Sequence, residues 1–248
     1  MRIVEAHWEK RNLGKTCFEI AIEPDDTLAS FDEAEQSVIN ENGAEYLVVK
    51  TPTGLTEFLH GLPSLGYTFL EASFRLTLKR SQYACPKMLE RLGRGTTTQT
   101  LSQDEDVERV YNEIRKGIFT ADRVTLDGHF SNEITDERYV NWISDVMGKG
   151  GVMCEVNVGN DAIGFFVLQP VDAKRVRGIL TGLYDTFSDS GLGGVLMKKL
   201  NDFVWDQGYS LYEAHVASNN LAALRSNLIF GAQIDEISYT YSKLIETT

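Results

Sequence analysis

The sequence predicts a mixed α/β (α+β) protein in which a mainly antiparallel sheet is flanked by helices. Three observations indicate this class: strand-like and helix-like patterns alternate, a Gly-Asn-Asp turn joins two apolar stretches as in a hairpin, and one part of the chain resembles another. The expected strands cover 17–22, 44–50, 68–78, 151–158, 162–169, 175–185, 209–216 and 233–244. The expected helices cover 31–42, 55–62, 103–117, 135–147, 192–207 and 220–229.

The helices are expected from the spacing of their apolar residues. In the segment 103–117, apolar residues recur every three or four positions, and Ser102 with Glu105 predicts a capping box at its start. The segment 135–147 has the same spacing, and Trp142 within it is expected to anchor the core. Both segments are therefore predicted to bury one apolar face.

Composition and charge exclude several classes of protein. With 248 residues, of which 42% are hydrophobic, the chain can bury a sizeable core as one large domain or two small ones. A net charge of −12 argues against sequence-independent binding to nucleic acid or to an anionic membrane. The chain has no apolar run of membrane-spanning length and no apolar signal core at its start, so a cytoplasmic protein is expected. Its three cysteines lack metal-ligand spacing, and no metal site is expected.

Two parts of the chain are similar when the sequence is shifted by 165 residues. The segment 43–79 then falls on 208–244 without a gap, and Gly43 meets Gly208. Both copies have the order helix, glycine, strand, short helix, glycine, long strand. The alternatives are a chance similarity and a shared architecture, and the second predicts two related modules.

The repeat also predicts how the chain divides. A smaller module is expected over 1–80 and a larger domain over 99–248. The segment between them, 81–98, has a proline, two glycines and a threonine run, as connectors often do.

A glycine-rich stretch, "SDSGLGG", separates an expected strand from the helix over 192–207. Glycine is a poor helix former, so Gly191, Gly193 and Gly194 indicate either a tight turn or the close approach of an anion. Backbone N–H groups and the positive end of the helix dipole make such a turn suitable for phosphate. The Walker pattern is absent and the dinucleotide pattern lacks its third glycine, so the pyrophosphate of coenzyme A is the favoured anion.

The stretches "LYDTFSDSGLGGVLMKKL" and "YEAHVASNNLAALRSNLIFGA" resemble the GNAT superfamily of acyl-CoA N-acyltransferases, over about 100–245. The family's loop pattern, Arg/Gln-x-x-Gly-x-Gly/Ala, falls here on Ser188, Gly191 and Gly193. Its next block, Asn-x-x-Ala-x-x-x-Tyr-x-x-x-Gly, falls on Asn220, Ala223, Asn227 and Gly231. The resemblance implies a GNAT-type sheet over the C-terminal part of the chain.

Farther upstream, "ADRVTLDGHFSNEITDERYVNWISDVM" is similar to the dTDP-fucosamine acetyltransferase branch of this superfamily. In that branch a truncated GNAT-like module precedes the catalytic one. The internal repeat is what such a layout would leave, with the half-GNAT-like module over 1–80.

The resemblance implies acetyl-CoA as co-substrate and an amine as acceptor. The residues that it assigns to the coenzyme are Leu183, Tyr184, Ser188, Asp189, Ser190, Gly191, Leu192, Gly193, Gly194, Asn220, Ala223 and Asn227. The backbone of Leu183 and Tyr184 would follow the pantetheine arm and hold the thioester oxygen as negative charge develops. Asn220 is either a helix cap or a coenzyme contact.

The sequence departs from the family at two positions. Asn227 replaces the tyrosine that usually protonates the leaving thiolate, and an amide cannot give up a proton. Ser188, beside Asp189, replaces a cationic or amide side chain at the start of the loop. The catalytic residues predicted with these departures are His215, Asn227 and Tyr239.

Each catalytic candidate has a structural alternative. His215 is either a base or a structural histidine, and Tyr239 or Tyr241 either supplies the missing hydroxyl or belongs to the core. Asp185 and Glu213 are either bases or ordinary charged residues at strand ends. The remaining candidates, which either cover the acceptor or pack at the surface, are Arg123, His129 and Tyr139.

Three functions follow from these alternatives. The first is an N-acetyltransferase that transfers an acetyl or short acyl group to a primary amine, with an amino sugar or sugar nucleotide as one acceptor. The second is a GNAT scaffold that binds an acyl-CoA or a sugar nucleotide without turnover. The third, an interaction domain, leaves the loop glycines unexplained. The expected partner is a small-molecule amine, and a second copy of the chain is an open alternative.

Overall fold

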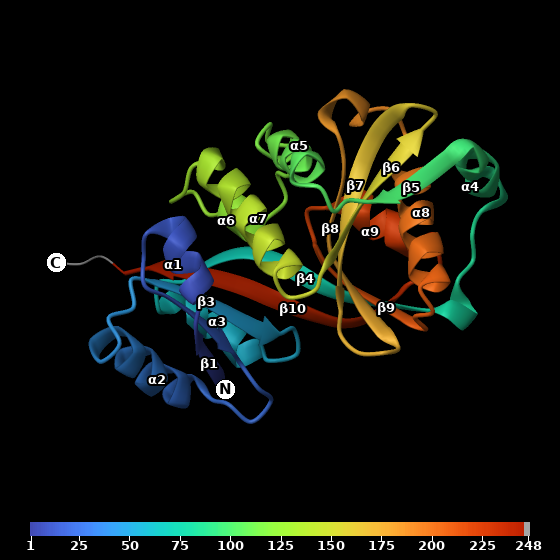
Figure 1. Cartoon of the computed structure of the whole chain (residues 1–248). Helices are drawn as coiled ribbons and strands as arrows, with labels where there is room; N and C mark the ends of the chain where they lie inside the picture. The colour runs from blue at the N-terminus through green and yellow to red at the C-terminus, as the bar shows by residue number, and fades with distance from the viewer. Residues whose placement is uncertain (246–248) are drawn as a thin grey trace.

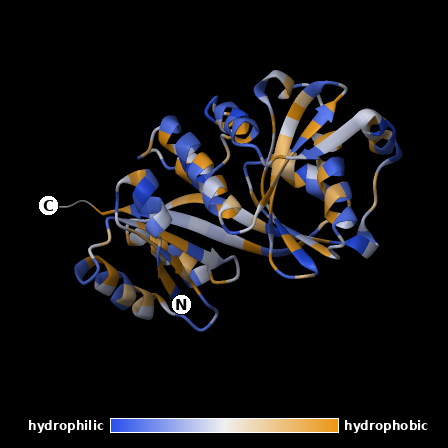
Figure 2. Ribbon diagram, in the orientation of Figure 1, coloured by the Kyte–Doolittle hydropathy of each residue, from blue (hydrophilic) through white to orange (hydrophobic). Residues whose placement is uncertain are grey.

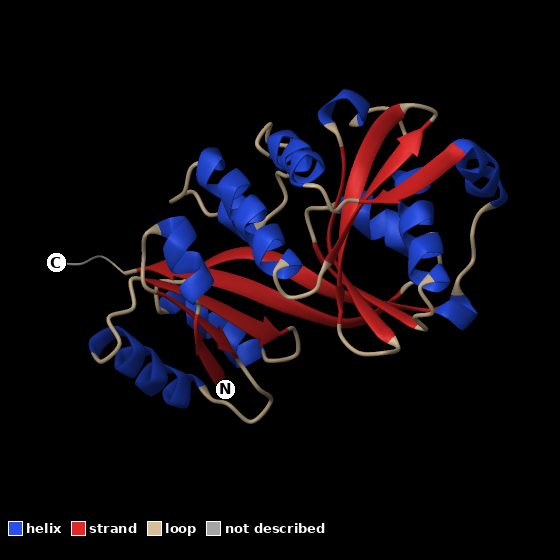
Figure 3. Cartoon of the chain, viewed as in Figure 1, coloured by secondary structure: helices blue, strands red, loops and turns tan. Residues whose placement is uncertain are grey.

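The computed structural model describes residues 1–245, which form one ten-stranded sheet with helices against its faces (Figures 1 and 3). The strands are β1 (Arg2–Glu5), β2 (Cys17–Ala21), β3 (Tyr46–Pro52), β4 (Thr68–Lys79), β5 (Thr96–Thr100), β6 (Val152–Val158), β7 (Asp161–Pro170), β8 (Arg175–Leu183), β9 (Leu211–Ala217) and β10 (Gln233–Leu244). The α-helices are α1 (His7–Leu13), α2 (Leu28–Asn40), α3 (Thr56–Ser64), α4 (Lys87–Leu92), α5 (Asp104–Ile114), α6 (Arg123–Leu126), α7 (Asn132–Met147), α8 (Gly193–Asp206) and α9 (Leu221–Leu228). The short 3-10 turns are η1 (Arg80–Gln82), η2 (Gly93–Gly95) and η3 (Asp185–Phe187).

The order of strands in the sheet is β1-β2-β3-β10-β4-β9-β8-β7-β6-β5. The last strand of the chain, β10, therefore lies between β3 and β4, and β4 lies between β10 and β9. Figure 1 shows β10, in red, running beside β4 across the middle of the molecule. Strands from the two ends of the chain thus alternate at the centre of the sheet.

The central register has an approximate two-fold symmetry. Ser73 of β4 lies opposite Ser238 of β10, and these two residues are related by the shift of 165. The flanking pairs obey the same rule. Thr51 lies opposite Tyr239, and their equivalents in the other repeat, Val216 and Phe74, lie opposite each other. The similarity read from the sequence therefore reflects a repeated architecture.

The two repeats exchange strands. In each repeat, the second long strand fills the space between the two strands of the other repeat. The expected connector, 81–98, covers the end of η1, all of α4 and η2 and the start of β5, which pairs with β6. The boundaries at 80 and 99 remain a prediction, but the two parts share one continuous sheet.

Helices cover both faces of the C-terminal strands. On one face α4 and α8 enclose a core that includes Leu89, Phe166 and Leu200, and on the other face α5 and α7 enclose a second core that includes Val110 and Phe165. A third core lies between α2, α3 and the N-terminal strands. Figure 2 shows hydrophobic residues gathered on the strands of the C-terminal half and mainly hydrophilic residues on α5. This distribution is that of a three-layer arrangement with a buried sheet.

Some local expectations were wrong. The capping box is absent: α5 has Gln103 at its N-cap without a side-chain hydrogen bond, so neither Ser102 nor Glu105 caps it. Three acidic residues in its first turn face the helix dipole instead. Trp142 is 40% exposed and is not a core anchor. The elements β1, α1, α4, β5 and α6 were not predicted; all are short, and local patterns are weak over so few residues.

Every helix among residues 1–245 is too short or too polar to cross a membrane.

The strand exchange predicts that the two halves unfold together. Leu78 on β4 is 1% exposed, and Leu78→Ala should lower the free energy of unfolding by about 2–5 kcal/mol because it leaves a cavity beneath β4. Urea unfolding followed by tryptophan fluorescence and far-ultraviolet circular dichroism should give one shared, shifted transition. The control is Leu221→Ala, since Leu221 is 52% exposed and should change stability by less than about 0.5 kcal/mol. Two separated transitions in the wild-type protein would contradict a shared sheet.

Candidate functional site

Strands β8 and β9 are parallel neighbours that separate partway along their length. They pair over 175–178 and 211–214, and no pairs follow although β8 continues to Leu183. The register of β8 against β7 shifts at the same point, leaving Ile179 as an extra residue. A bulge bends a strand and increases its twist, and it accounts for the departure of β8 from β9. We call the gap between 179–183 and the end of β9 the opening.

The point of separation is packed closely. A Cβ on Gly178 would lie 2.4 Å from the hydroxyl oxygen of Tyr212, so a side chain at this position would displace the tyrosine ring. Tyr212 is buried, and burial raises the pKa of its phenol. Gly178 is therefore required where the two strands part.

One backbone amide of β8 is directed at the opening. The N–H of Tyr184 donates to the carbonyl of Ile163 at 2.9 Å, which places it on the side of β7. Because successive residues of a strand direct their amides to opposite sides, the N–H of Leu183 faces away from β7 and toward the opening. Of the two residues predicted to contact the coenzyme through their backbone, Leu183 is thus the one whose N–H group faces the opening. The phenol of Tyr184 is buried and donates to Glu155 at 2.6 Å, so its pKa is raised.

The N-terminal repeat has no corresponding opening. Its strand β2 pairs with the parallel β3 over the whole of β2, 17–21 with 46–50, and β3 ends two residues further on. The segment equivalent to the glycine loop carries Glu23 and Asp26, whose carboxylates accept hydrogen bonds from the amino group of Met1. Only the C-terminal repeat combines separated strands with a glycine-rich turn.

The three glycines of the loop differ in whether the fold requires glycine at their position. Gly191 has a φ of +74°, which favours glycine, and a Cβ on Gly194 would lie 2.9 Å from Leu89 of α4. Gly193 has neither constraint, because the nearest atom to its Cβ, on Leu183, would be 4.0 Å away. The fold therefore explains Gly191 and Gly194, and only Gly193 leaves open space at the start of α8.

The start of α8 has free backbone donors. Among residues 1–245, the amides of Gly193 and Gly194 have no hydrogen-bond acceptor, while the amide of Leu192 donates to the hydroxyl of Ser190 at 3.2 Å. The dipole of this 14-residue helix adds partial positive charge at the same place. Ser188 and Asp189 are exposed. The geometry suits an anion that avoids the carboxylate of Asp189.

The second motif forms a chain of hydrogen bonds along α9. The side chain of Asn220 accepts from the amide of Ala223 at 3.0 Å, so its role as a helix cap is confirmed. The side-chain amide of Asn227 donates to the carbonyl of Ala223 at 2.9 Å. Asn227 is buried, and one of its donors is thus used within the helix. No proton donor is created at this position.

His215 lies at the edge of the opening. It is the first residue of β9 after the last β8–β9 pair, and it lies opposite Arg75 of β4. The residue is exposed, and partial desolvation of its ring, together with the positive charges of Arg177, Lys50 and Arg75, lowers its pKa. A lowered pKa keeps the imidazole neutral near pH 7, as a proton acceptor requires.

Tyr239 does not lie beside the loop or His215. Its ring contacts Phe69, with ring centroids 5.7 Å apart, and it packs against the N-terminal aromatic core. Tyr241 is buried in the same core. A catalytic role for Tyr239 remains a prediction that no contact in the structure supports.

Two of the residues expected to cover the acceptor are held in place by contacts with carboxylates. Arg123 is buried and pairs with Glu9 at 2.8 Å and Glu19 at 2.6 Å, so its charge is already compensated. His129 contacts the buried carboxylate of Asp127 through its ring nitrogen. Among residues 1–245, neither side chain has a hydrogen bond or ion pair with a residue of the opening.

Three further candidates have distinct environments. Tyr139 lies on the buried face of α7, and burial raises its pKa. Asp185 is an exposed residue of η3, whereas Glu213 is buried and lies 3.7 Å from the guanidinium groups of Arg175 and Arg177. Glu213 shares the face of β9 on which His215 lies.

Sequence reasoning missed a set of paired charges that we call the polar network. Its members come from α1, β2, β3, α7 and the start of α6, and they are Glu9, Glu19, Lys50, Asp122, Arg123 and Arg138. Arg138 binds Glu9 at 2.7 Å and Asp122 at 2.6 Å, and Lys50 binds Glu19 at 3.1 Å. These pairs lower the pKa of Glu9 and of Glu19 to about 2, although burial alone would raise both.

Glu71 of β4 lies next to the polar network without an ion pair among the described residues. Its Oε2 atom is buried and has no hydrogen-bond partner. Burial, with the nearby charge of Asp122, raises its pKa to about 7, against the opposing effect of Arg123 and Lys50. The signal in the sequence was the alternation in β4, where polar residues from Glu71 to Lys79 occupy every second position.

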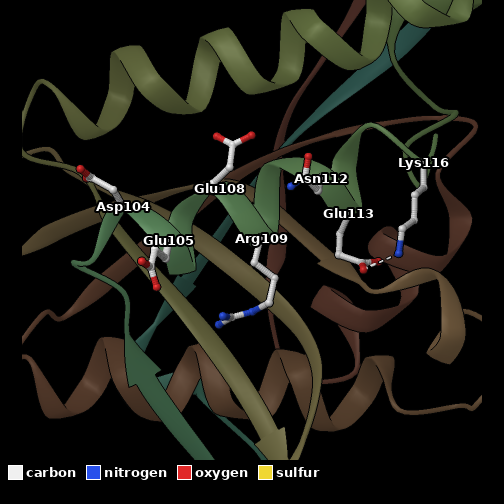
Figure 4. A pocket seen from close by; sticks show the side chains of 7 residues that line it. All are labelled: Asp104, Glu105, Glu108, Arg109, Asn112, Glu113 and Lys116. Atoms are coloured by element: carbon white, nitrogen blue, oxygen red, sulfur yellow. Dashed lines mark hydrogen bonds and ion pairs between the residues drawn. The ribbon is translucent and has the colours of Figure 1, made fainter.

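A separate hollow of about 670 Å³ follows the outer side of α5 (Figure 4). Its charged lining is largely paired, since Lys116 binds Glu113 and Arg109 binds Asp106. Arg109 also binds Glu155, the acceptor for Tyr184, at 2.9 Å. All the lining residues come from one stretch, 104–116, and we assign the hollow no chemistry.

Within 1–245, no group of three or more His, Cys, Asp or Glu side chains is arranged to hold a metal ion.

Comparisons with known proteins give a likeness in fold. No protein-family model matches the chain, and no curated protein matches it. A GCN5-related N-acetyltransferase from Sphaerobacter thermophilus is similar with a TM-score of 0.64 and 13% identity, over 99% of this chain and 76% of that one. A tandem GNAT protein from the clavulanic acid biosynthesis pathway is similar with a TM-score of 0.58 and 11% identity, over 95% and 77% of the two chains.

A third match is a glucosamine N-acetyltransferase region in a fungal multi-domain GH3 β-N-acetylglucosaminidase. Its TM-score is 0.63 at 9% identity, over 98% of this chain and 31% of that one. At these identities the comparisons show the fold alone: the chain has a mixed α/β fold like that of GNAT acetyltransferases, including a tandem one. The predicted fold class is therefore confirmed, and the resemblance to the dTDP-fucosamine branch remains a prediction.

The polar network predicts loss of stability in acid. Because the folded-state pKa values of Glu9 and Glu19 are depressed to about 2, their stabilising contribution is present above about pH 4.5 and is lost as pH falls toward 2. Glu9→Gln should lower the free energy of unfolding at pH 7 by about 3–5 kcal/mol, since it leaves Arg138 and Arg123 undercompensated in a buried site. Urea unfolding at pH 7 and at pH 3, inside the window between 4.5 and 2, measures both effects. Glu90→Gln, at an exposed position of α4, is the control; equal stability of the two variants would refute the role of the network.

Proposed function

We propose that the chain is an N-acyltransferase that transfers an acetyl or short acyl group from coenzyme A to a primary amine. The observation that carries this proposal is that two features occur together in the C-terminal repeat. The bulge at Ile179 opens the sheet, and the helix start after the opening has free amides with open space at Gly193. A fold like that of GNAT acetyltransferases supports the same reaction class.

The coenzyme would lie along β8. Its pyrophosphate fits the amides of Gly193 and Gly194, where a side chain at Gly193 would intrude. From there the pantetheine arm would follow the unpaired edge of β8 past Leu183 toward Ile179, a length of about 13 Å for four residues of strand. The thioester would then lie next to His215, at the point where the strands part.

The chemical step needs a proton acceptor and a route for the leaving thiolate. The amine nitrogen attacks the carbonyl carbon, the C–S bond breaks with its electron pair on sulfur, and the proton of the amine passes to His215. The lowered pKa of His215 suits this role. Because Asn227 cannot protonate the sulfur, the coenzyme leaves as a thiolate, which is a tolerable leaving group, as the pKa of about 8.5 of a free cysteine thiol indicates.

The acceptor is a small amine that enters over the face of β9 that carries His215. An amino sugar or sugar nucleotide is one candidate, and the likeness in fold to a glucosamine N-acetyltransferase region is compatible with it. A cytoplasmic location and a second copy of the chain as partner stay as predictions from the sequence.

One observation favours a second function, a scaffold that binds an acyl-CoA without turnover. Asn227 is committed to Ala223 and supplies no proton donor. Thiol release from acetyl-CoA, measured with a disulfide reagent over a panel of amines, separates the two functions. Thermal stabilisation by coenzyme A with no thiol release would establish the binder, and the absence of any shift would exclude both.

Gly193 gives the sharpest test of the coenzyme site. Gly193→Glu should weaken coenzyme A binding by about 2–3 kcal/mol, or at least about 30-fold, because a carboxylate would stand where the pyrophosphate lies. The variant should keep its fold, since a Cβ at Gly193 meets nothing closer than 4.0 Å. Isothermal titration calorimetry with coenzyme A measures the effect.

The matched control is Gly54→Glu. Gly54 also has open space around its Cβ and no positive φ, but it lies in the N-terminal half. Unchanged affinity in Gly193→Glu, or an equal loss in Gly54→Glu, would remove the proposed site.

His215 predicts the pH profile of the reaction. His215→Ala should lower kcat/KM by about 10²–10⁴-fold. In the wild-type protein, kcat/KM should decrease as the pH falls below the depressed pKa of His215, whose usual value is about 6.5, because the protonated ring cannot accept a proton. The variant should lose this acidic limb. His60→Ala, in an exposed position of α3, should leave both rate and profile unchanged; an acidic limb that survives in His215→Ala would assign it to another group.

A further inference from the structure

The N-terminal half contributes side chains to the same face of the sheet as His215. Arg75 of β4 lies opposite His215, and residues two apart along a strand share a face, so Glu71, Ser73 and Arg75 follow one another toward the polar network. Lys50 of β3 lies opposite Thr240 of β10, which in turn lies opposite Glu71, so Lys50 is on this face as well. A polar strip thus runs from the opening to Glu71.

The charges around Glu71 are otherwise compensated. Each cation of the polar network has a carboxylate within 3.1 Å, since Arg123 and Arg138 bind Glu9 and Lys50 binds Glu19. The network holds three cations and three carboxylates, and Glu71 is an additional carboxyl next to it. Among the described residues Glu71 has neither an ion pair nor a hydrogen bond to its buried Oε2 atom.

An unpaired buried carboxyl is costly for a fold. Buried carboxylates are normally paired or hydrogen-bonded, and a group that lacks a partner is either neutralised or reserved for a ligand. Ser238 and Thr240, which lie near Glu71 on β10, show that uncharged residues are accommodated on this face. A positively charged group from outside the chain would satisfy Glu71 completely.

We propose that Glu71, from the N-terminal half, binds a second cationic nitrogen of the acceptor while the reacting amine lies at His215. The inference rests on the proposed function and specifies its substrate as a diamine or polyamine. Arg75, the neighbour of His215, lies four residues along β4 from Glu71, and four residues of strand span about 13 Å. The two ends of the acceptor would therefore lie about 13 Å apart. A long, flexible acceptor with a charge at each end matches this strip.

The test compares three probes of equal chain length: 1,8-diaminooctane, 8-amino-1-octanol and octylamine. Isothermal titration calorimetry on the coenzyme-free protein should show that the diamine binds about tenfold or more tightly than the amino alcohol or the monoamine. Glu71→Gln should remove that preference and leave octylamine binding unchanged. Glu71→Asp, which keeps the carboxyl, should retain a preference for the diamine.

The control is Glu236→Gln. Glu236 is equivalent to Glu71 in the repeat, but it is exposed and pairs with Arg75 at 3.2 Å. Its variant should keep the wild-type preference for the diamine. An unchanged preference in Glu71→Gln, or equally tight binding of the amino alcohol by the wild-type protein, would overturn the inference.

Turnover gives an independent readout. With acetyl-CoA, Glu71→Gln should reduce kcat/KM for the diamine about tenfold and leave kcat/KM for octylamine unchanged. If the wild-type protein neither binds coenzyme A nor releases thiol, the proposed function fails, while calorimetry with the diamine still decides the role of Glu71.

Discussion

The exchange of β4 and β10 at the centre of the sheet is the constraint on which the rest of the structure depends. Each of these two strands forms its backbone hydrogen bonds with two strands of the other repeat, β4 with β10 and β9 and β10 with β3 and β4, so neither repeat is a complete sheet alone. The exchange also places β4, from the N-terminal half, directly beside β9. His215 therefore has Arg75 as its cross-strand neighbour, and the surroundings of the opening come from both ends of the chain.

The two repeats use this common frame differently. In the N-terminal repeat the parallel strands β2 and β3 stay paired, and the turn before α2 is acidic. In the C-terminal repeat one extra residue, Ile179, parts β8 from β9, and the turn before α8 presents free amides. A single inserted residue and a change of turn chemistry thus separate a closed repeat from an open one. The bulge bends the strand without breaking its pairing with β7.

The sequence predicted the parts of the fold that local patterns encode. The hairpin at Gly159, the glycine turn before α8 and the 165-residue repeat all rest on residues close together or on direct similarity. It could not predict the exchange of β4 and β10, because register between distant strands depends on the whole sheet. The role of each glycine was equally hidden: only the three-dimensional contacts distinguish Gly194, which accommodates Leu89, from Gly193, which is open. Trp142 was misplaced because helical spacing locates an apolar face but does not show what covers it.

The symmetry of the repeat allows Glu71 to be compared with its equivalent residue in the other repeat. The shift of 165 residues relates Glu71 to Glu236 and Lys50 to His215, so each repeat sets a glutamate and a basic residue on the same face. Glu236 is exposed and paired, whereas Glu71 is partly buried beside the polar network of α1, α6 and α7. The difference arises because α6 packs against β4 near Glu71, whereas Glu236 is exposed to solvent. Desolvation without a partner raises the pKa of Glu71 to about 7, so the carboxyl exchanges readily between a proton and an external cation at neutral pH.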